Sequence, residues 1–461
     1  MKTFTQNLKT FRPLALTLFL ATLSTGAIAQ TATAPAAPAT DLASFLSTFR
    51  FDAGPPKNTW VQSIAVSAPA YCSSIKGDTT VTFKAPGMTI VHAFCWQQPV
   101  TGNPSPWGHD AELAPGLQLD AEGNGSFVFH ADQFPNGPLN LRIYARDAGS
   151  NQDYCELQLF NQGGVVWNQG IPKTDPPAAK GLKVVFADDF DGPLSISGDN
   201  SGKYWTHWGG GDGSSWPFTD FQSPLNPFSQ VKGQVKNYLR IHASKPPGTR
   251  GATGTLTPIH RDDTGFAAMA PCYFECRLIA QNATGTWPAF WLTTHGSKAC
   301  DELDGIEGYG TNSKSGGIWT AYHATTHFWN QPVPAWVKDK AKGPDGNTYA
   351  AHKLVTPMLL GGGSSWSTTF HTYGVLIKPD FTSYYFDDIE VLRHPTGRIS
   401  AALPISFLVN LAIGGGGWKA NLERYGNQSD MWVDYVRVYS DKPAVTGPKD
   451  FPPAPVLQPG T

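Results

Sequence analysis

Four carboxylates lie within seven residues of this chain, in which only 15% of the residues are charged. They are Asp301, Glu302, Asp304 and Glu307, in the sequence CDELDGIEGY of residues 300–309. Side chains alternate between faces along a strand, so Glu302 and Asp304 share one face. A single bulged residue before Glu307 returns its side chain to that face. The stretch therefore predicts a bulged strand that presents three acids on one surface.

Carboxylates held this close repel one another, and the pKa of at least one of them rises. Retaining cleavage of a glycosidic bond needs two carboxyl groups with different pKa values, because one attacks in its ionised form while the other donates a proton. The two carboxyl groups of such a pair lie roughly 5–5.5 Å apart, whereas five residues of straight strand span roughly 16 Å. Strand curvature and convergent side chains would have to close that gap. A solvated acidic strand and a cation site are the alternatives for these residues.

The composition favours a β-rich protein that acts on a neutral partner. The chain has 461 residues, 40% of them hydrophobic, and is long enough for two or three domains. Its 48 glycines, 38 prolines and aromatic content of 12% favour short strands and turns over long helices. The net charge of −2 offers no basic field for a nucleic acid, so we expect no nucleic-acid partner.

The first 29 residues are typical of a secretory signal peptide. Lys2, Lys9 and Arg12 precede an apolar run over residues 13–23, and the sequence AIA at 27–29 forms a small-x-small cleavage site. Later stretches fall short of the roughly 20 apolar residues that span a membrane. We therefore expect a secreted protein, extracellular or periplasmic, without membrane insertion.

Strand patterns and linkers divide the rest of the chain. Alternation of apolar and polar residues over 139–146, with turn signals at 124–125 and 136–137, predicts a small immunoglobulin-like sandwich. Similar patterns after a proline-rich stretch predict a larger all-β domain, so a fragment that begins near Lys180 should fold by itself. The expected divisions are a linker that could form a short helix (30–58), the immunoglobulin-like module (59–170), a proline-rich linker (171–181), the large β domain (182–441) and a disordered proline-rich tail (442–461).

Six segments of the larger domain occur in the order found in family 16 glycoside hydrolases. They are FADDFDG at 186–192, YFECR at 273–277, WPAFWL at 287–292, the acidic stretch, NLAIGG at 410–415 and WVDYVRVY at 432–439. Together they extend over residues 182–441, which resemble the laminarinase, agarase and carrageenase group. The resemblance implies a concanavalin-like jelly-roll β-sandwich as the catalytic domain.

The same resemblance implies a role for each acid. Glu302 would be the nucleophile, Asp304 the intervening acid that tunes it, and Glu307 the general acid and base. Negative charge on Glu302 and Asp304 would raise the pKa of Glu307 toward the protonated state. His323 matches a histidine that flanks the cleft in the family; a surface imidazole is its alternative role.

Aromatic side chains should line the cleft, because sugar rings stack on Trp and Tyr. Alternation puts Trp287 and Trp291 on one strand face, opposite Phe290 and Leu292, and these two tryptophans are the stacking candidates. Trp418, which follows a run of four glycines, is a third. Core packing is the alternative for Trp287 and Trp291.

The resemblance also raises the question of a metal ion. Asp434 resembles a residue that holds a structural calcium in many relatives, with backbone carbonyls near Asp189 completing an all-oxygen shell. A solvent-facing Asp434 without an ion is the alternative. No cofactor is expected for catalysis. The insertion over 206–230 fits no subfamily, which leaves the substrate open.

Export permits disulfides among the six cysteines. We expect Cys300 to pair with Cys272 or Cys276 and so to brace the acidic strand. Two of the three cysteines before residue 160, namely Cys72, Cys95 and Cys155, should pair with each other.

The sequence thus predicts a secreted, monomeric, endo-acting retaining hydrolase of a β-linked polysaccharide, with β-1,3-glucan as the first expectation. Agar-type galactans and bacterial exopolysaccharides are alternative substrates. A transglycosylase and a carbohydrate-binding protein without turnover are alternative functions.

Overall fold

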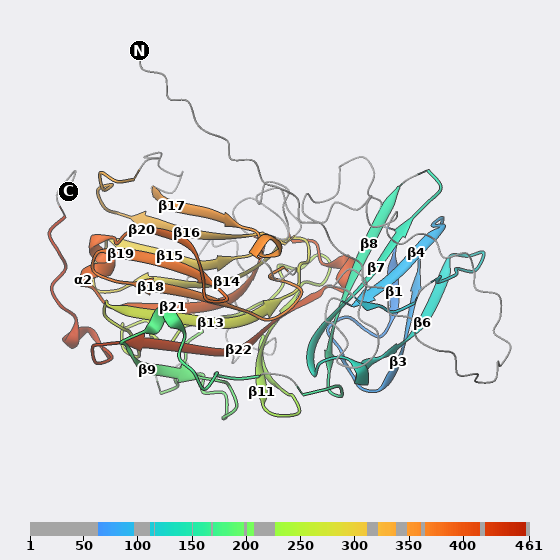
Figure 1. Cartoon of the computed structure of the whole chain (residues 1–461), viewed down its shortest axis with the longest axis horizontal. Coiled ribbons are helices and arrows are strands. Elements are labelled where there is room, and N and C mark those ends of the chain that lie inside the picture. Colours follow the sequence, from blue (N-terminus) through green and yellow to red (C-terminus); the bar gives the residue numbers. More distant parts are fainter. Residues whose placement is uncertain are drawn as a thin grey trace, which may run out of the picture. The chain divides into compact units, whose positions relative to one another are not determined.

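Strands make up nearly all of the regular structure in this computed structural model (Figure 1). It describes residues 63–95, 111–114, 116–149, 151–166, 169–197, 201–206, 226–310, 321–337, 348–360, 365–414 and 420–457. The predicted signal peptide, the 30–58 linker, Trp418 and most of the 206–230 insertion lie outside these ranges. Within them, no helix has the length and apolarity needed to cross a membrane.

The first part of the described chain is a β-sandwich of two sheets. One sheet has the order β1-β3-β6 and the other β2-β8-β7-β4-β5. Their strands are β1 (Ala65–Ala68), β2 (Ser74–Ile75), β3 (Asp78–Lys84), β4 (Ile90–Cys95), β5 (Ala111–Glu112), β6 (Asn124–His130), β7 (Gly137–Arg146) and β8 (Gln152–Asn161). Phe83 of β3 and Leu141 of β7 share one buried cluster, so the two sheets enclose a common core. Its assignment to the immunoglobulin class stays a prediction.

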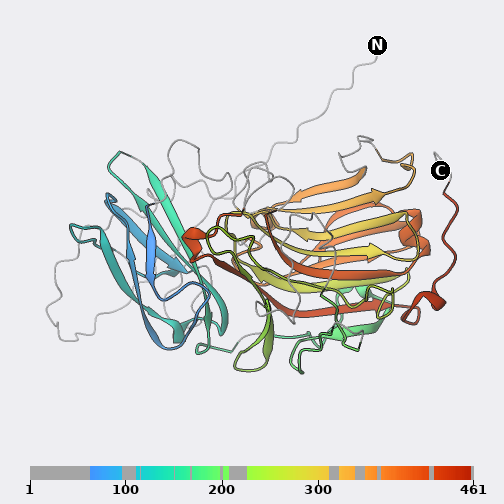
Figure 2. The ribbon, with the colours of Figure 1, turned by 180° about the vertical axis from the view of Figure 1, so that it is seen from behind.

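The larger part is a second sandwich, as the sequence predicts. An eight-stranded sheet has the order β10-β11-β22-β13-β18-β19-β20, with β9 also paired to β22; a six-stranded sheet has the order β12-β21-β14-β15-β16-β17. Figures 1 and 2 show β14 to β17 side by side from opposite directions. The strands are β9 (Lys183–Asp188), β10 (Phe228–Lys232), β11 (Asn237–Ser244), β12 (Thr255–Leu256), β13 (Cys272–Ala280), β14 (Thr286–Thr294), β15 (Cys300–Glu307), β16 (Tyr322–Trp329), β17 (Thr348–Val355), β18 (His371–Ile377), β19 (Phe381–Phe386), β20 (Ile389–Pro395), β21 (Ile405–Ile413) and β22 (Gln428–Ser440); the short helix α2 is Arg398–Ala402.

Strand β15 carries the predicted bulge. Its neighbour β14 pairs Trp291 with Asp304 and Phe290 with Ile306, which leaves Gly305 unpaired between them. A Cβ atom at Gly305 would lie 3.2 Å from Phe290 and 3.4 Å from Val375 of the opposite sheet. Glycine therefore suits this close approach. The extra residue returns the side chain of Glu307 to the face that carries Glu302 and Asp304.

The two sandwiches share buried residues, against the expectation of separate cores. The described residues belong to one compact unit, and one hydrophobic cluster contains both Tyr71 and Tyr425. Phe160 packs on Trp432 with ring centroids 4.9 Å apart, and Arg424 donates to Asp153 at 2.9 Å. A fragment that begins near Lys180 would expose these residues, so we now expect it to lose stability.

The two segments expected to be a linker and a disordered tail are packed where the structure describes them. Tyr439 donates to Asp175 of the first segment at 2.9 Å. In the tail, Val445 forms a β-bridge with Ala267, and Leu457 packs beside α2, where both ribbon views show the end of the described chain. Disorder is therefore the wrong prediction for residues 442–457, because their apolar side chains find buried partners.

The predicted disulfides are also wrong in this structure. Cys272, Cys276 and Cys300 are thiols, as are Cys72 and Cys155, so none of the expected pairs forms. Cys272 and Cys276 lie on β13 of the eight-stranded sheet, whereas Cys300 begins β15 in the other sheet. Cys300 instead contacts the hydroxyl of Thr293 at 3.0 Å.

Candidate active site

Three acids lie on the outer face of β15. Across the strand pair with β16, Glu302 faces His327, Asp304 faces Thr325, and Glu307 faces His323. Residues directly opposite in an antiparallel pair share a face. Leu303 and Ile306 point the other way, with exposures of 1% and 0%. The predicted arrangement of three acids on one surface is confirmed.

The fourth acid of the stretch has a structural role. Asp301 is fully buried on the core side, where it accepts hydrogen bonds from the backbone N–H of Ser400 at 2.9 Å and its hydroxyl at 2.6 Å. Gln331 donates to the same carboxyl group at 2.6 Å. Asp301 therefore ties β15 to α2, which contains Ser400, and takes no part in the acid face.

Glu302 is the accessible acid at one end of this face. Its side chain is 24% exposed, and the indole of Trp329 donates to its Oε2 at 3.2 Å. The Nε2 atom of His327 lies 3.8 Å from its Oε1. A donor and an imidazole beside a half-buried carboxylate stabilise its charge and fix its direction, which suits a nucleophile.

Asp304 is the buried acid in the middle. It is 3% exposed, with Oδ2 lying 3.5 Å from His327 Nε2. Burial raises the pKa of Asp304 well above its usual value, and the negative charges of Glu307 and Glu302 raise it further. Asp304 therefore holds a proton more tightly than an ordinary carboxyl group, in line with the predicted tuning role.

Glu307 lies at the other end. The phenol of Tyr309 donates to its Oε1 at 2.8 Å, and the hydroxyl of Thr325 donates to its Oε2 at 3.4 Å. Burial, and then the charge of Glu307, raise the pKa of Tyr309 well above its usual value, so the phenol stays a donor. Two half-buried glutamates on either side of a buried aspartate can supply a nucleophile and a proton donor from one surface.

Both described tryptophan candidates lie on the acid face. Trp287 and Trp291 are half-buried, whereas Phe290 and Leu292 between and after them are fully buried, as alternation predicts. The Trp287 ring lies 5.0 Å from that of Tyr309, and Trp291 donates to Asn410 at 2.7 Å. Their partial exposure beside the acids is consistent with stacking against a sugar, which stays a prediction.

His323 is a member of a histidine pair beside Glu307. Its Nδ1 lies 2.7 Å from Nε2 of His352 on β17, and its ring meets Tyr309 edge-on at 5.0 Å. Burial, and then the neighbouring His352, lower the pKa of His323 to about 4. The imidazole is therefore neutral near pH 7, and it adds no positive charge next to Glu307.

Sequence reasoning missed the other members of the same strand face. His327 and Trp329 contact Glu302, and Tyr349 on β17 lies edge-on to His327 at 4.4 Å. Thr325, His327 and Trp329 follow His323 at every second position, which places them on one strand face. The intervening Ala324 and Thr326 are fully buried, but their types carry too little apolar signal to reveal the strand.

Asp434 does not fit the expected calcium site. It is fully buried, its carboxylate oxygens accept the backbone N–H of Gly170 at 2.9 Å, and Arg277 donates to it at 2.8 Å. Lys236 Nζ lies 3.5 Å from Asp434 and 3.8 Å from Asp189. Calcium needs six to eight oxygen ligands, whereas here cationic side chains and an N–H group surround the carboxylate. The expectation of a calcium ligand is therefore wrong for this arrangement.

A β-sandwich with three acids on the outer face of one sheet is the arrangement that the sequence resemblance implies. Residues 267–437, which include β15 and most of both sheets, match the model of glycosyl hydrolases family 16. This match agrees with the resemblance seen in the sequence.

Two curated relatives come from Rhizobium meliloti. The endo-1,3-1,4-beta-glycanase ExsH is 31% identical over 350 residues, which cover 70% of this chain and 64% of the relative. The endo-1,3-1,4-beta-glycanase EglC is 28% identical over 278 residues, covering 56% and 52%. The chain thus spans between half and two thirds of their length. Among solved structures, an endo-beta-1,3-glucanase from Pyrococcus furiosus is similar with 21% identity, a TM-score of 0.43, and coverage of 60% of this chain and 100% of that chain.

Proposed function

We propose that this protein is an endo-acting, retaining hydrolase of a β-linked glucan with 1,3 or mixed 1,3-1,4 linkages. The acid face of β15 is the observation that carries the proposal. The names of the two Rhizobium relatives support the β-1,3 and β-1,4 linkages and the endo mode. The leader-like residues 1–29 support export, and we propose that the protein acts as a monomer.

Glu302 would attack the anomeric carbon while Glu307 donates its proton to the departing glycosidic oxygen. The bond to the leaving sugar breaks as the bond to Glu302 Oε forms, which gives a glycosyl ester. Glu307, now ionised, would remove a proton from water, and the hydroxide would release the sugar from Glu302. Asp304, which lies between Glu302 and Glu307, would assist by staying protonated. It then adds no third negative charge to the site.

A substrate panel tests the proposal. The protein is incubated with laminarin, lichenan, agarose, carrageenan and xyloglucan, and the products are sized over time. We expect laminarin or lichenan to fall rapidly in length and to yield a ladder of oligosaccharides. Release of single sugars without a fall in chain length would contradict the endo mode, and turnover of agarose alone would contradict the glucan.

The same reactions with added oligosaccharide acceptors separate hydrolysis from glycosyl transfer. A hydrolase should give the same products with and without acceptor. Products longer than the acceptor, formed in preference to reducing ends, would identify a transglycosylase instead.

A further inference from the structure

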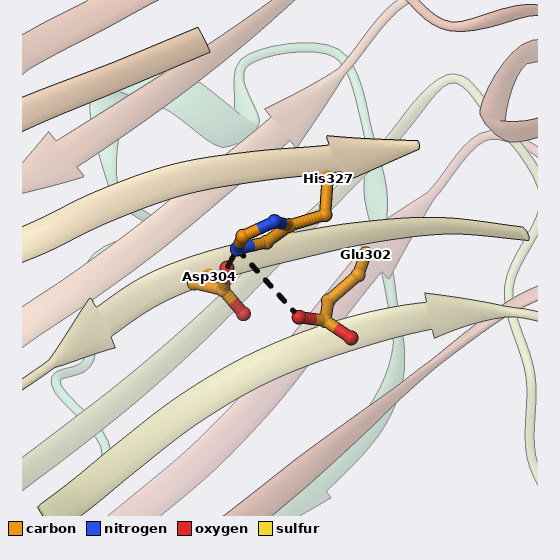
Figure 3. Close-up of side chains that lie close together, drawn as sticks. All are labelled: Glu302, Asp304 and His327. Atoms are coloured by element: carbon orange, nitrogen blue, oxygen red, sulfur yellow. Dashed lines mark ion pairs between the residues drawn. The ribbon is translucent and has the colours of Figure 1, made fainter. Parts of the chain in front are cut away.

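We propose that Glu302, Asp304 and His327 form a binding site for a divalent transition-metal ion, with Zn²⁺ as the reference ion. The three side chains come from adjacent strands and converge on one point (Figure 3). One ligand atom of each lies within 4.8 Å of the others. This metal would be an inhibitor and would take no part in the reaction.

The spacing of the ligand atoms suits a small ion. His327 Nε2 lies 3.5 Å from Asp304 Oδ2 and 3.8 Å from Glu302 Oε1. Two ligands of a tetrahedral Zn²⁺, with bonds of roughly 2.0–2.2 Å, lie about 3.4 Å apart. Glu302 is partly exposed and can move, so small side-chain adjustments would complete the geometry. The fourth position faces the outer side of the sheet and is left for water.

A second observation points to a ligand at this position. Asp304 Oδ2 is directed toward His327 Nε2 and has no hydrogen-bond partner, although the side chain is 3% exposed. A buried carboxyl oxygen without a hydrogen-bond partner is costly, and a cation that displaces the carboxyl proton would satisfy it. His327 is itself 6% exposed, so two of the three ligands are already fixed by the surrounding fold.

The donor set selects the class of metal. One imidazole nitrogen and two carboxylate oxygens suit Zn²⁺, and Cu²⁺ should bind more tightly still. Ca²⁺ and Mg²⁺ prefer shells built from oxygen alone, with six or more ligands. The site should therefore discriminate against Ca²⁺ and Mg²⁺.

The functional consequence rests on the proposed function. A metal held by Glu302 occupies the carboxylate that would attack the sugar, so metal and substrate should compete. Substrate would be bound more weakly at a given metal concentration, whereas turnover at saturating substrate would be unchanged.

Binding is measured directly by titrating Zn²⁺ into the purified full-length protein in a calorimeter, with Ca²⁺ as a parallel titrant. We expect one equivalent of Zn²⁺ and no saturable binding of Ca²⁺ at the same concentrations. His327→Asn should weaken Zn²⁺ binding at least about 100-fold, because it removes the nitrogen ligand. Thermal unfolding of each variant verifies that it is folded, and Asp304→Asn, which removes a second ligand, should weaken binding as well.

His352→Asn is the matched control. It removes an imidazole from the His323–His352 pair on the same sheet, where the two nitrogens are 2.7 Å apart, and should leave Zn²⁺ binding unchanged. Absence of stoichiometric binding, full binding in folded His327→Asn, or loss of binding in His352→Asn would each overturn the proposal.

Zn²⁺ that binds as expected to a protein inactive on every glucan would support the site and overturn the proposed function. If the protein is active, Zn²⁺ should raise KM without lowering kcat, and a chelator should reverse the effect.

Discussion

Two buried aspartates of the larger sandwich differ in how their charge is balanced. Asp434 on β22 is fully buried, with Arg277 at 2.8 Å, Lys236 at 3.5 Å and a backbone N–H at 2.9 Å. Asp304 on β15 is nearly as buried, but its neighbours are the glutamates Glu302 and Glu307 and the imidazole of His327. The first has the partners that a buried charge needs, and the second lacks them.

The difference separates a structural acid from a reactive one. A carboxylate with cations and donors on both oxygens stays fixed and joins the strands that supply them. A carboxyl group buried among other acids has a raised pKa, and it can hold a proton that neighbouring acids lose. On this view the unbalanced charge on β15 supplies the reactivity, and the balanced cluster on β22 supplies stability.

Removing the proposed nucleophile should have the largest effect on activity. Glu302→Gln keeps the shape of the side chain but cannot attack, so turnover should fall by roughly four to six orders of magnitude without loss of folding. Initial rates on the preferred glucan and a thermal unfolding scan measure the two properties. Glu390→Gln, on exposed β20 where Glu390 pairs with Arg393 at 2.5 Å, is the control and should be fully active. A Glu302→Gln protein with more than a few per cent of wild-type activity would contradict the view that the acids of β15 supply the reactivity.

Asp434→Asn should have the opposite profile. It leaves Arg277 and Lys236, with exposures of 15% and 6%, without their shared counter-charge. Loss of one partner from such a buried set costs about 3–5 kcal/mol of unfolding free energy. Urea unfolding measures this loss, whereas kcat of the folded fraction should be unchanged. The exposed neighbour Asp189, 3.8 Å from Lys236, provides the control: Asp189→Asn should cost less than about 1 kcal/mol. Equal losses in the two variants would refute the view that burial makes the Asp434 cluster structural.

Asp304→Asn should lower activity on the order of 10²-fold, less than Glu302→Gln, because no reacting atom is lost. Its stability should change with pH. The folded-state pKa of Asp304 lies above its unfolded value, so the wild-type protein loses stability as the pH rises above about 4. The amide does not titrate. The Tm of Asp304→Asn relative to the wild type should therefore rise as the pH is raised above about 4, and a constant difference would show that Asp304 is not an unbalanced acid.

The smallest effect concerns the cysteines. Because the described Cys272, Cys276 and Cys300 are thiols, a reductant should leave the Tm unchanged within about 1 °C. Thiol labelling should be slow in the native protein, since Cys272 and Cys276 are fully buried, and rapid in denaturant. A large drop in Tm on reduction would show that a disulfide forms after all.

Local patterns were enough to predict most of the fold and the central acids. Alternation predicted the strand over 139–146 that is β7 and the two faces of β14. The shared face of Glu302, Asp304 and Glu307 required the bulge that lies at Gly305. Strand β16 was missed because Ala324 and Thr326 on its core face carry little apolar signal. His327 was missed with it.

Pairings between distant segments could not be read from the sequence. Arg277 and Lys236 lie 157 and 198 residues before Asp434 and meet it only because β11, β22 and β13 are neighbours. The separation of Cys272 and Cys300 could not be read from the sequence either, because the two residues are close in sequence but belong to different sheets. The calcium ligand was expected from the family resemblance, and the disulfide from export and the position of Cys300 beside the acidic strand. Neither expectation could include the partners that the sheet order brings together.

The stereochemistry of cleavage tests the central claim most directly. If Glu302 forms a covalent intermediate and Glu307 serves as acid and then base, two displacements retain the configuration at the anomeric carbon. Proton NMR spectra recorded during the first minutes of hydrolysis of a β-linked glucan should show the β-anomer before mutarotation produces the α form. Initial appearance of the α-anomer would mean a single displacement by water, and would contradict the assignment of Glu302 as the nucleophile.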